Sequence, residues 1–121
     1  MAEYTSTHVP VSQDPDKLYA AAVRVFLKKG WNFQSRDPQA RAVETDWVEQ
    51  DGTYGASGSK VWLSYRVLIN RDSIDVFSSC KMGGLTRRDC PTNERPPGTA
   101  DKERKLVEEI INESGIVADT P

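Results

Sequence analysis

The feature that most constrains this chain is a long alternating run that begins at Lys60. Its odd-numbered residues, from Val61 to Ile69, are aliphatic or aromatic and share one face of an extended chain. The even-numbered residues mix charged, polar and apolar side chains on the other face. After a short connection the alternation resumes at Ile74 and Val76, and so short a connection predicts antiparallel pairing of the two segments.

Two shorter strands are expected before this run. Residues 31–35 and 43–47 alternate apolar with polar side chains, and the turn at 37–40 contains Asp and Pro, which both favour turns. The segment 51–59 holds three glycines and is expected to be a flexible loop. Together with the later pair, these segments predict a four-stranded antiparallel meander.

A first amphipathic helix is predicted over 14–29. Asp14 can cap it, Pro15 suits its first position, and Gly30 follows as its terminator. Its apolar residues recur at helical spacing and form one stripe, namely Leu18, Ala21, Ala22, Val25 and Phe26.

A second helix is predicted over 99–114, capped by Thr99 and ended by Gly115, with Glu103 in its first turn. Its stripe is Leu106, Val107, Ile110 and Ile111. Two such helices can cover one face of the sheet, which predicts a two-layer α+β fold in the order helix–strand–strand–strand–strand–helix. The predicted core is Leu18, Ala22, Val25, Phe26, Phe33, Val43, Leu63, Tyr65, Val67, Ile69, Ile74, Val76, Val107, Ile110 and Ile111.

The length suits one domain, so a single domain over 1–121 is expected. Its amino end, 1–13, is expected to be extended. The segment 81–98, with prolines and glycines but no apolar periodicity, is expected to be a long loop, and the tail 116–121 is expected to fray.

Charge and composition limit the classes of function. The formal net charge of −2 does not indicate strong nucleic-acid binding, and no apolar run reaches about 18 residues, the length that spans a membrane. One histidine and two cysteines are too few for most common metal or nucleophile sites, so neither a metal nor another cofactor is expected.

The two cysteines, Cys80 and Cys90, suggest a disulfide if the chain works in an oxidising compartment, and they would be free thiols in a cytosol. The amino end shows no signal-peptide pattern. Two readings stay open, a cytosolic start or a removed signal segment, and the cysteine pair favours the second.

Few groups could carry chemistry. His8 has no nucleophile beside it in sequence and is interpreted as a solvated residue near the amino end. Glu44 and Asp46 are expected to share a strand face, where paired carboxylates could do acid–base work but more simply solvate the sheet. Arg87 and Arg88 make the predicted long loop locally basic, which gives a weak anion-binding signal.

The most informative surface is the sheet face opposite the predicted helices. Trp62, Leu68 and Phe77 should project from it, with Arg66 at its rim. An exposed apolar patch with a charged rim would be a partner site. The alternative is that the extended amino end or the long loop folds over these residues.

The chain resembles small envelope lipoprotein domains of Gram-negative bacteria over about residues 14–80. The matching segments are Asp14–Ala22, Gly30–Phe33, Arg36–Pro38 and Ala42–Trp47. It is similar in particular to the helix-grip domains of the lipoprotein subunit of the outer-membrane β-barrel assembly machinery. It departs from them in having one domain, no visible lipid-bearing cysteine and a cysteine-containing loop. The resemblance implies a periplasmic binding or scaffold role and no catalytic residue.

The leading hypothesis is therefore a non-enzymatic interaction or scaffold module at the periplasmic face of the envelope, with an envelope protein as partner. A second hypothesis is a carrier of a lipid or metabolite, with a cavity lined by Phe33, Trp47 and Tyr65. A third is a cytosolic regulatory or toxin-neutralising partner with two free thiols. An enzyme would have to use Glu44, Asp46, Tyr65 or the cysteines, and is the minority interpretation.

Overall fold

The computed structural model describes residues 3–50, 60–83, 87–90 and 98–118. Its helices are α1 (Pro15–Lys28) and α2 (Thr99–Ala118). Its strands are β1 (Glu3–Pro10), β2 (Phe33–Asp37), β3 (Ala42–Thr45), β4 (Val48–Glu49), β5 (Lys60–Ile69), β6 (Ser73–Gly83) and β7 (Arg87–Asp89).

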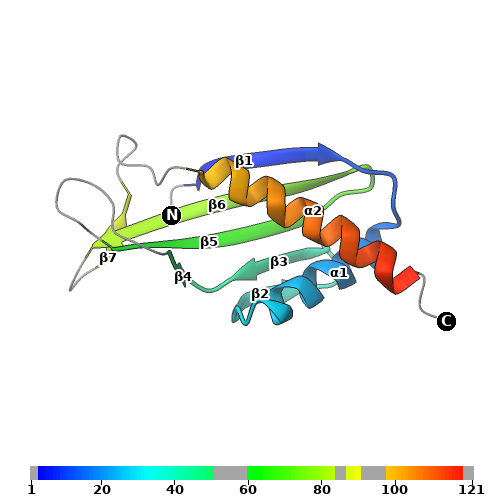
Figure 1. Cartoon of the computed structure of the whole chain (residues 1–121), viewed down its shortest axis with the longest axis horizontal. Helices are drawn as coiled ribbons and strands as arrows, with labels where there is room; N and C mark the ends of the chain where they lie inside the picture. The colour runs from blue at the N-terminus through cyan, green and yellow to red at the C-terminus, as the bar shows by residue number, and fades with distance from the viewer. Residues whose placement is uncertain (1–2, 51–59, 84–86, 91–97, 119–121) are drawn as a thin grey trace.

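The strands form one antiparallel sheet, and both helices lie on the same side of it (Figure 1). The main path is β1-β6-β5-β3-β2, with β4 also paired to β5 and β7 to β6. Helix α1 packs on β3 and β5, and α2 packs on β1 and β6 and against α1. The α+β class and the one-sided helices are confirmed, whereas the four-stranded meander is wrong because the sheet has seven strands among the described residues.

The additional strands come from segments with weak patterns. The extended amino end pairs with β6, with Val9 opposite Ile74. Strand β6 runs on to Gly83, so the start of the predicted loop 81–98 is strand, and Met82 is fully buried. The rest of that loop is described only at β7, Cys90 and Gly98, while the predicted loop 51–59 lies outside the described residues.

Helix α1 matches its prediction closely. The Asp14 carboxylate accepts a hydrogen bond from the Asp16 backbone N–H at 3.0 Å, which caps the helix. Gly30 follows the helix with a φ of +74°, the left-handed conformation that glycine adopts without a steric penalty.

Helix α2 begins at Thr99 as predicted but ends later than predicted. It continues through Gly115 to Ala118, although Gly115 was expected to end it. Gly115 does not have a positive φ, and an internal glycine costs only about 1 kcal/mol relative to alanine. Part of the predicted frayed tail is therefore helical. Near the other end Glu103 is fully buried, accepting hydrogen bonds from Thr7 Oγ1 at 2.7 Å and Ser78 Oγ at 2.5 Å.

The core lies between the helices and the inner face of β5 and β6. All of the predicted core residues are buried there except Phe33 and Ile111, which pack at its margin. The core also contains Ala21, Val61, Cys80, Met82 and Leu106. The alternation from Val61 to Ile69 is thus confirmed as the inward face of the central strand.

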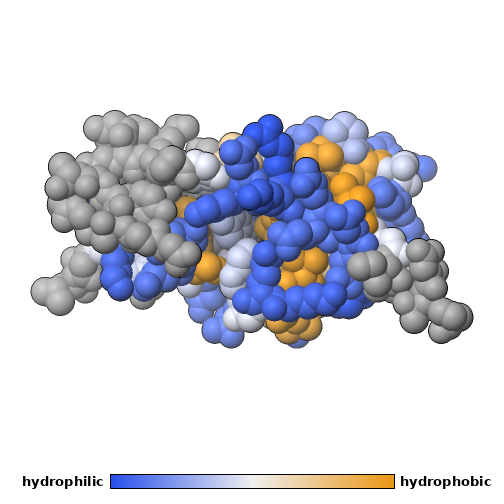
Figure 2. Space-filling model, viewed as in Figure 1, coloured by the Kyte–Doolittle hydropathy of each residue, from blue (hydrophilic) through white to orange (hydrophobic). Residues whose placement is uncertain are grey.

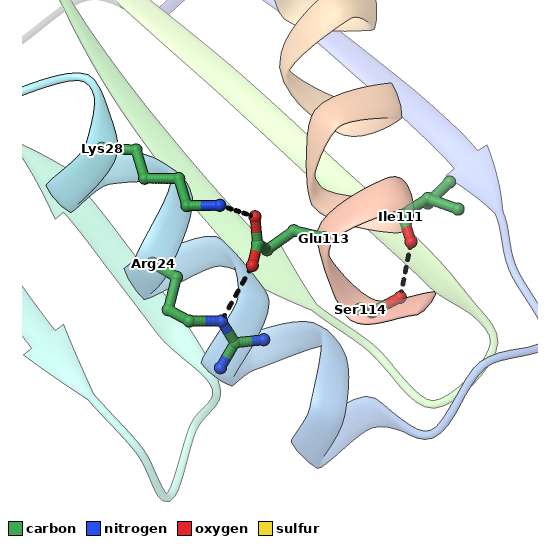
Figure 3. A network of polar contacts seen from close by, with 5 residues as sticks. All are labelled: Arg24, Lys28, Ile111, Glu113 and Ser114. Atoms are coloured by element: carbon green, nitrogen blue, oxygen red, sulfur yellow. Dashed lines mark hydrogen bonds and ion pairs between the residues drawn. The ribbon is translucent and has the colours of Figure 1, made fainter. Parts of the chain in front are cut away.

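An ion-pair cluster joins the two helices. Glu113 of α2 is largely buried and accepts from Lys28 Nζ at 2.6 Å and from Arg24 Nε at 3.2 Å. Figure 3 shows both cations of α1 pointing at this carboxylate. The hydrogen bond from Lys28 is the main cause that holds the Glu113 pKa below its ordinary value.

The cysteines form a disulfide between β6 and the residue after β7. Cys80 and Cys90 have Cα atoms 5.4 Å apart, and the Cys90 N–H donates to the Cys80 carbonyl at 3.1 Å. The predicted pairing is confirmed. It closes a loop over a sequence separation of 10, and such a crosslink stabilises mainly by restricting the unfolded chain.

We expect Glu113 to make folding stability depend on acid pH. Because its folded-state pKa is lowered, its contribution is present above the unfolded-state pKa of about 4.3 and is lost as the pH falls through the folded-state value. Between neutral and acid pH, the E113Q variant should therefore lose less stability than the wild-type protein loses. Thermal unfolding at several pH values measures both losses. The exposed Glu108→Gln is the matched control, and an equal flattening in that variant would contradict the assignment.

Removal of the disulfide should destabilise the fold without abolishing it. Loop-closure entropy for a crosslink of this length predicts a loss of about 3 kcal/mol for the double variant Cys80→Ala and Cys90→Ala. Urea unfolding of oxidised wild type, reduced wild type and the variant measures this loss. The reduced wild-type protein and the variant should have the same free energy of unfolding. A loss below about 1 kcal/mol in both would show that the crosslink constrains little.

Candidate functional site

The predicted partner residues lie on the sheet face opposite the helices. In the β5–β6 ladder Trp62 faces Lys81, Arg66 faces Phe77, and Leu68 faces Asp75. Their direction is as predicted, but their exposure differs, because Arg66 is exposed, Leu68 and Phe77 are half-buried, and Trp62 is only 7% exposed. For Trp62 this burial agrees with the alternative that another part of the chain covers it, and not with an exposed patch.

Two cation–aromatic pairs mark this face. The Arg66 guanidinium carbon lies 4.7 Å from the centre of the Phe77 ring, and Lys81 Nζ lies 4.9 Å from that of Trp47. We call Trp47, Trp62, Arg66, Leu68, Phe77 and Lys81 the outer face. Strand β1 lies beside β6 at the sheet edge, so the amino end pairs with the sheet rather than folding over these residues.

The other sequence candidates are dispersed. His8 lies on β1 opposite Asp75 and is exposed to solvent as predicted, and its Nδ1 contacts the Asp75 carboxylate. Glu44 faces Arg66 across β3 and β5, while Asp46 lies beyond the end of β3 and accepts from the Trp47 N–H at 2.9 Å. These two carboxylates therefore do not form one strand pair.

The two arginines of the predicted loop lie on a strand. Arg87 and Arg88 belong to β7, where they pair with Gly83 and Met82 of β6. Arg88 is exposed. The prediction of an irregular loop is therefore wrong at these two positions, while their anion-binding role stays a prediction.

A cavity of about 300 Å³ lies on the helix side of the sheet, between β4, β5, α2 and the residues that follow α1. It is lined by Lys29, Trp31, Val48, Glu49, Gln50, Tyr65, Lys102, Lys105, Leu106 and Glu109. Of the predicted lining residues only Tyr65 is present. Trp47 lies under Lys81 of the outer face, and Phe33 stacks on Phe26 with ring centres 5.9 Å apart.

The cavity has an aromatic wall and a charged rim. The Trp31 and Tyr65 rings stack with their centres 5.3 Å apart, and Lys29 Nζ lies 5.3 Å from the centre of the Trp31 ring. Burial, followed by the negative charge of Glu103, raises the pKa of the Tyr65 hydroxyl well above its ordinary value, so Tyr65 is neutral at physiological pH. From the helix side, most of the surface is hydrophilic, with several separate apolar patches (Figure 2).

A second cleft beside α1 is lined in part by Tyr19, Arg24 and Arg36. Its cations are already engaged, because Arg24 bonds Glu113 and the Arg36 guanidinium carbon lies 4.8 Å from the centre of the Phe33 ring. The first cavity is therefore the better candidate for a charged ligand.

Comparison with protein-family models and with curated proteins gave no match to this chain. Within the described ranges, no three His, Cys, Asp or Glu side chains cluster in a way that could hold a metal ion. The two described helices include none that is long and apolar enough to cross a membrane.

We expect Trp62 and Phe77 to respond differently to truncation. Trp62→Ala should cost about 3–5 kcal/mol of unfolding free energy, because it removes a large buried ring. Phe77→Ala should cost about 1 kcal/mol, because that ring is half-buried. Urea unfolding of both variants measures the difference. Equal losses would contradict the difference in burial between Trp62 and Phe77 on the outer face.

Proposed function

We propose that this chain is a non-enzymatic interaction or scaffold module of the cell envelope, which binds a protein partner through its outer face. The observation that carries the proposal is the pair of aromatic rings held beneath cations on the sheet side away from both helices. Aromatic side chains and arginine are enriched at the centres of protein interfaces, and a half-buried ring gives contact area at little entropic cost.

The charges around these rings favour a protein as the occupant. Glu44 stands opposite Arg66, Asp75 opposite Leu68, and Asp89 opposite Lys81, so acidic and basic groups alternate across the face. A nucleic acid would be repelled by the acidic groups, whereas a protein partner can present complementary charges of both signs. The mixed rim around Phe77 and Leu68 therefore suits a specific protein contact.

The disulfide supports an extracytoplasmic setting, because such bonds persist in oxidising compartments. The resemblance to envelope lipoprotein domains adds the periplasm as the proposed location and a lipid-anchored parent as the proposed context. In this proposal the disulfide holds in place the end of β6 that carries Lys81. Lys81 lies beside Trp47 and Trp62 of the outer face.

The proposal predicts site-specific crosslinking in the native compartment. A photoreactive amino acid in place of Phe77 should give one discrete adduct with an envelope protein. The same group in place of Leu27, which is 59% exposed on α1, should not give that adduct. Adding Arg66→Ala should reduce the Phe77 adduct about tenfold, the effect of losing an interface anchor of about 1.4 kcal/mol. No adduct at Phe77, or the same adduct at Leu27, would contradict the proposal.

A second candidate function is small-ligand carriage, and the cavity beside Trp31 and Tyr65 favours it. Its volume is at the lower end of the range of ligand sites. Native mass spectrometry of the purified chain tests it by showing whether a small molecule is retained. This function is independent of the outer face, because the cavity is on the helix side of the sheet.

A further inference from the structure

The charges that line the cavity do not cancel. The Glu109 carboxylate is paired with Lys29 at 3.0 Å, and that of Glu49 with Lys60 at 3.6 Å. Lys102 donates only to the neutral Gln50 amide oxygen, at 2.5 Å. Among the described residues no carboxylate lies within ion-pair distance of Lys102 or Lys105.

These two lysines lie together on one edge of the cavity. Lys102 and Lys105 are three residues apart on α2, a spacing that places side chains on the same side of a helix. Both line the cavity, and Lys105 is exposed at its mouth. The pair therefore presents two positive charges to a molecule entering from solvent.

Part of the cavity lining is apolar. The stacked Trp31 and Tyr65 rings form an aromatic wall there, with Val48 and Leu106 beside it and Lys29 Nζ 5.3 Å from the centre of the Trp31 ring. Glu103 lies behind Tyr65 and contributes negative charge there. An anionic group is therefore favoured at the lysine edge and disfavoured at the Tyr65 end, which gives the cavity a polarity.

We propose that this cavity binds a small organic anion of the aromatic carboxylate class, with its carboxylate between Lys102 and Lys105 and its ring against the Trp31–Tyr65 wall. A volume of about 300 Å³ equals roughly ten water molecules at about 30 Å³ each, which suits one or two fused rings and not a lipid chain. The inference rests on the second candidate function and is independent of the outer face.

The test uses three probes on the intact, disulfide-bonded chain labelled with ¹⁵N. The probes are 2-naphthoate, its neutral amide 2-naphthamide, and acetate. Amide chemical shifts should move at Trp31, Gln50 and Leu106 with 2-naphthoate, which should bind about tenfold more tightly than the amide. With acetate, the chemical-shift changes should not reach saturation. Added salt should weaken 2-naphthoate binding, because these lysines are partly exposed and their attraction is screened.

Charge-matched variants separate the site from the overall charge of the chain. Lys105→Gln should weaken 2-naphthoate binding about three- to fivefold. Arg104→Gln, on the neighbouring position of α2 and paired with Asp101 at 2.6 Å, removes the same charge and should leave it unchanged. Equal binding of naphthoate and naphthamide would overturn the anion assignment while leaving ligand carriage intact. Absence of shifts at the cavity with both aromatic probes would overturn the proposed ligand class.

Discussion

The β5–β6 ladder is the interaction on which the rest of the structure depends. It pairs the two strands continuously from Lys60 opposite Gly83 to Ile69 opposite Ile74. Because side chains alternate along a strand, one register sets both faces at once, and a slip of one residue would exchange them. The inner face of this ladder collects the core beneath α1 and α2, and the outer face collects the cation–aromatic pairs. Strands β1, β3, β4 and β7 then attach to its edges.

The sequence predicts the parts of this fold that rest on strong local patterns. The alternation from Val61 to Ile69 and the capped, striped helix α1 were both recoverable, because burial of one face leaves a period in the sequence. Strand β1 could not be predicted in this way. Its backbone hydrogen bonds are made by pairing with β6, and an edge strand needs no apolar period in its sequence. The end of α2 was placed too early because Gly115 has the residue type of a terminator but not its backbone conformation.

The sites were predicted less well than the fold, since they depend on distant contacts. Glu103 looks like a first-turn residue that faces solvent, yet hydroxyl groups from β1 and β6 reach its carboxylate inside the protein. The lysine pair of the cavity likewise belongs to a helix whose charged face is ordinarily solvated. It lines a pocket only together with Trp31 and Tyr65, which come from distant parts of the chain. Trp62 has the direction that alternation requires, but its burial depends on neighbouring segments that sequence periodicity does not describe.

In the proposed function the two sides of one sheet have different tasks, and the outer face binds a protein partner. Hydroxyl-radical footprinting of the chain in its native compartment and after purification tests that claim most directly. We expect oxidation of Phe77 and Leu68 to be lower in the native compartment than in the purified protein, while oxidation of Leu27 on α1 stays the same. Equal oxidation of Phe77 and Leu68 in the two settings would contradict it.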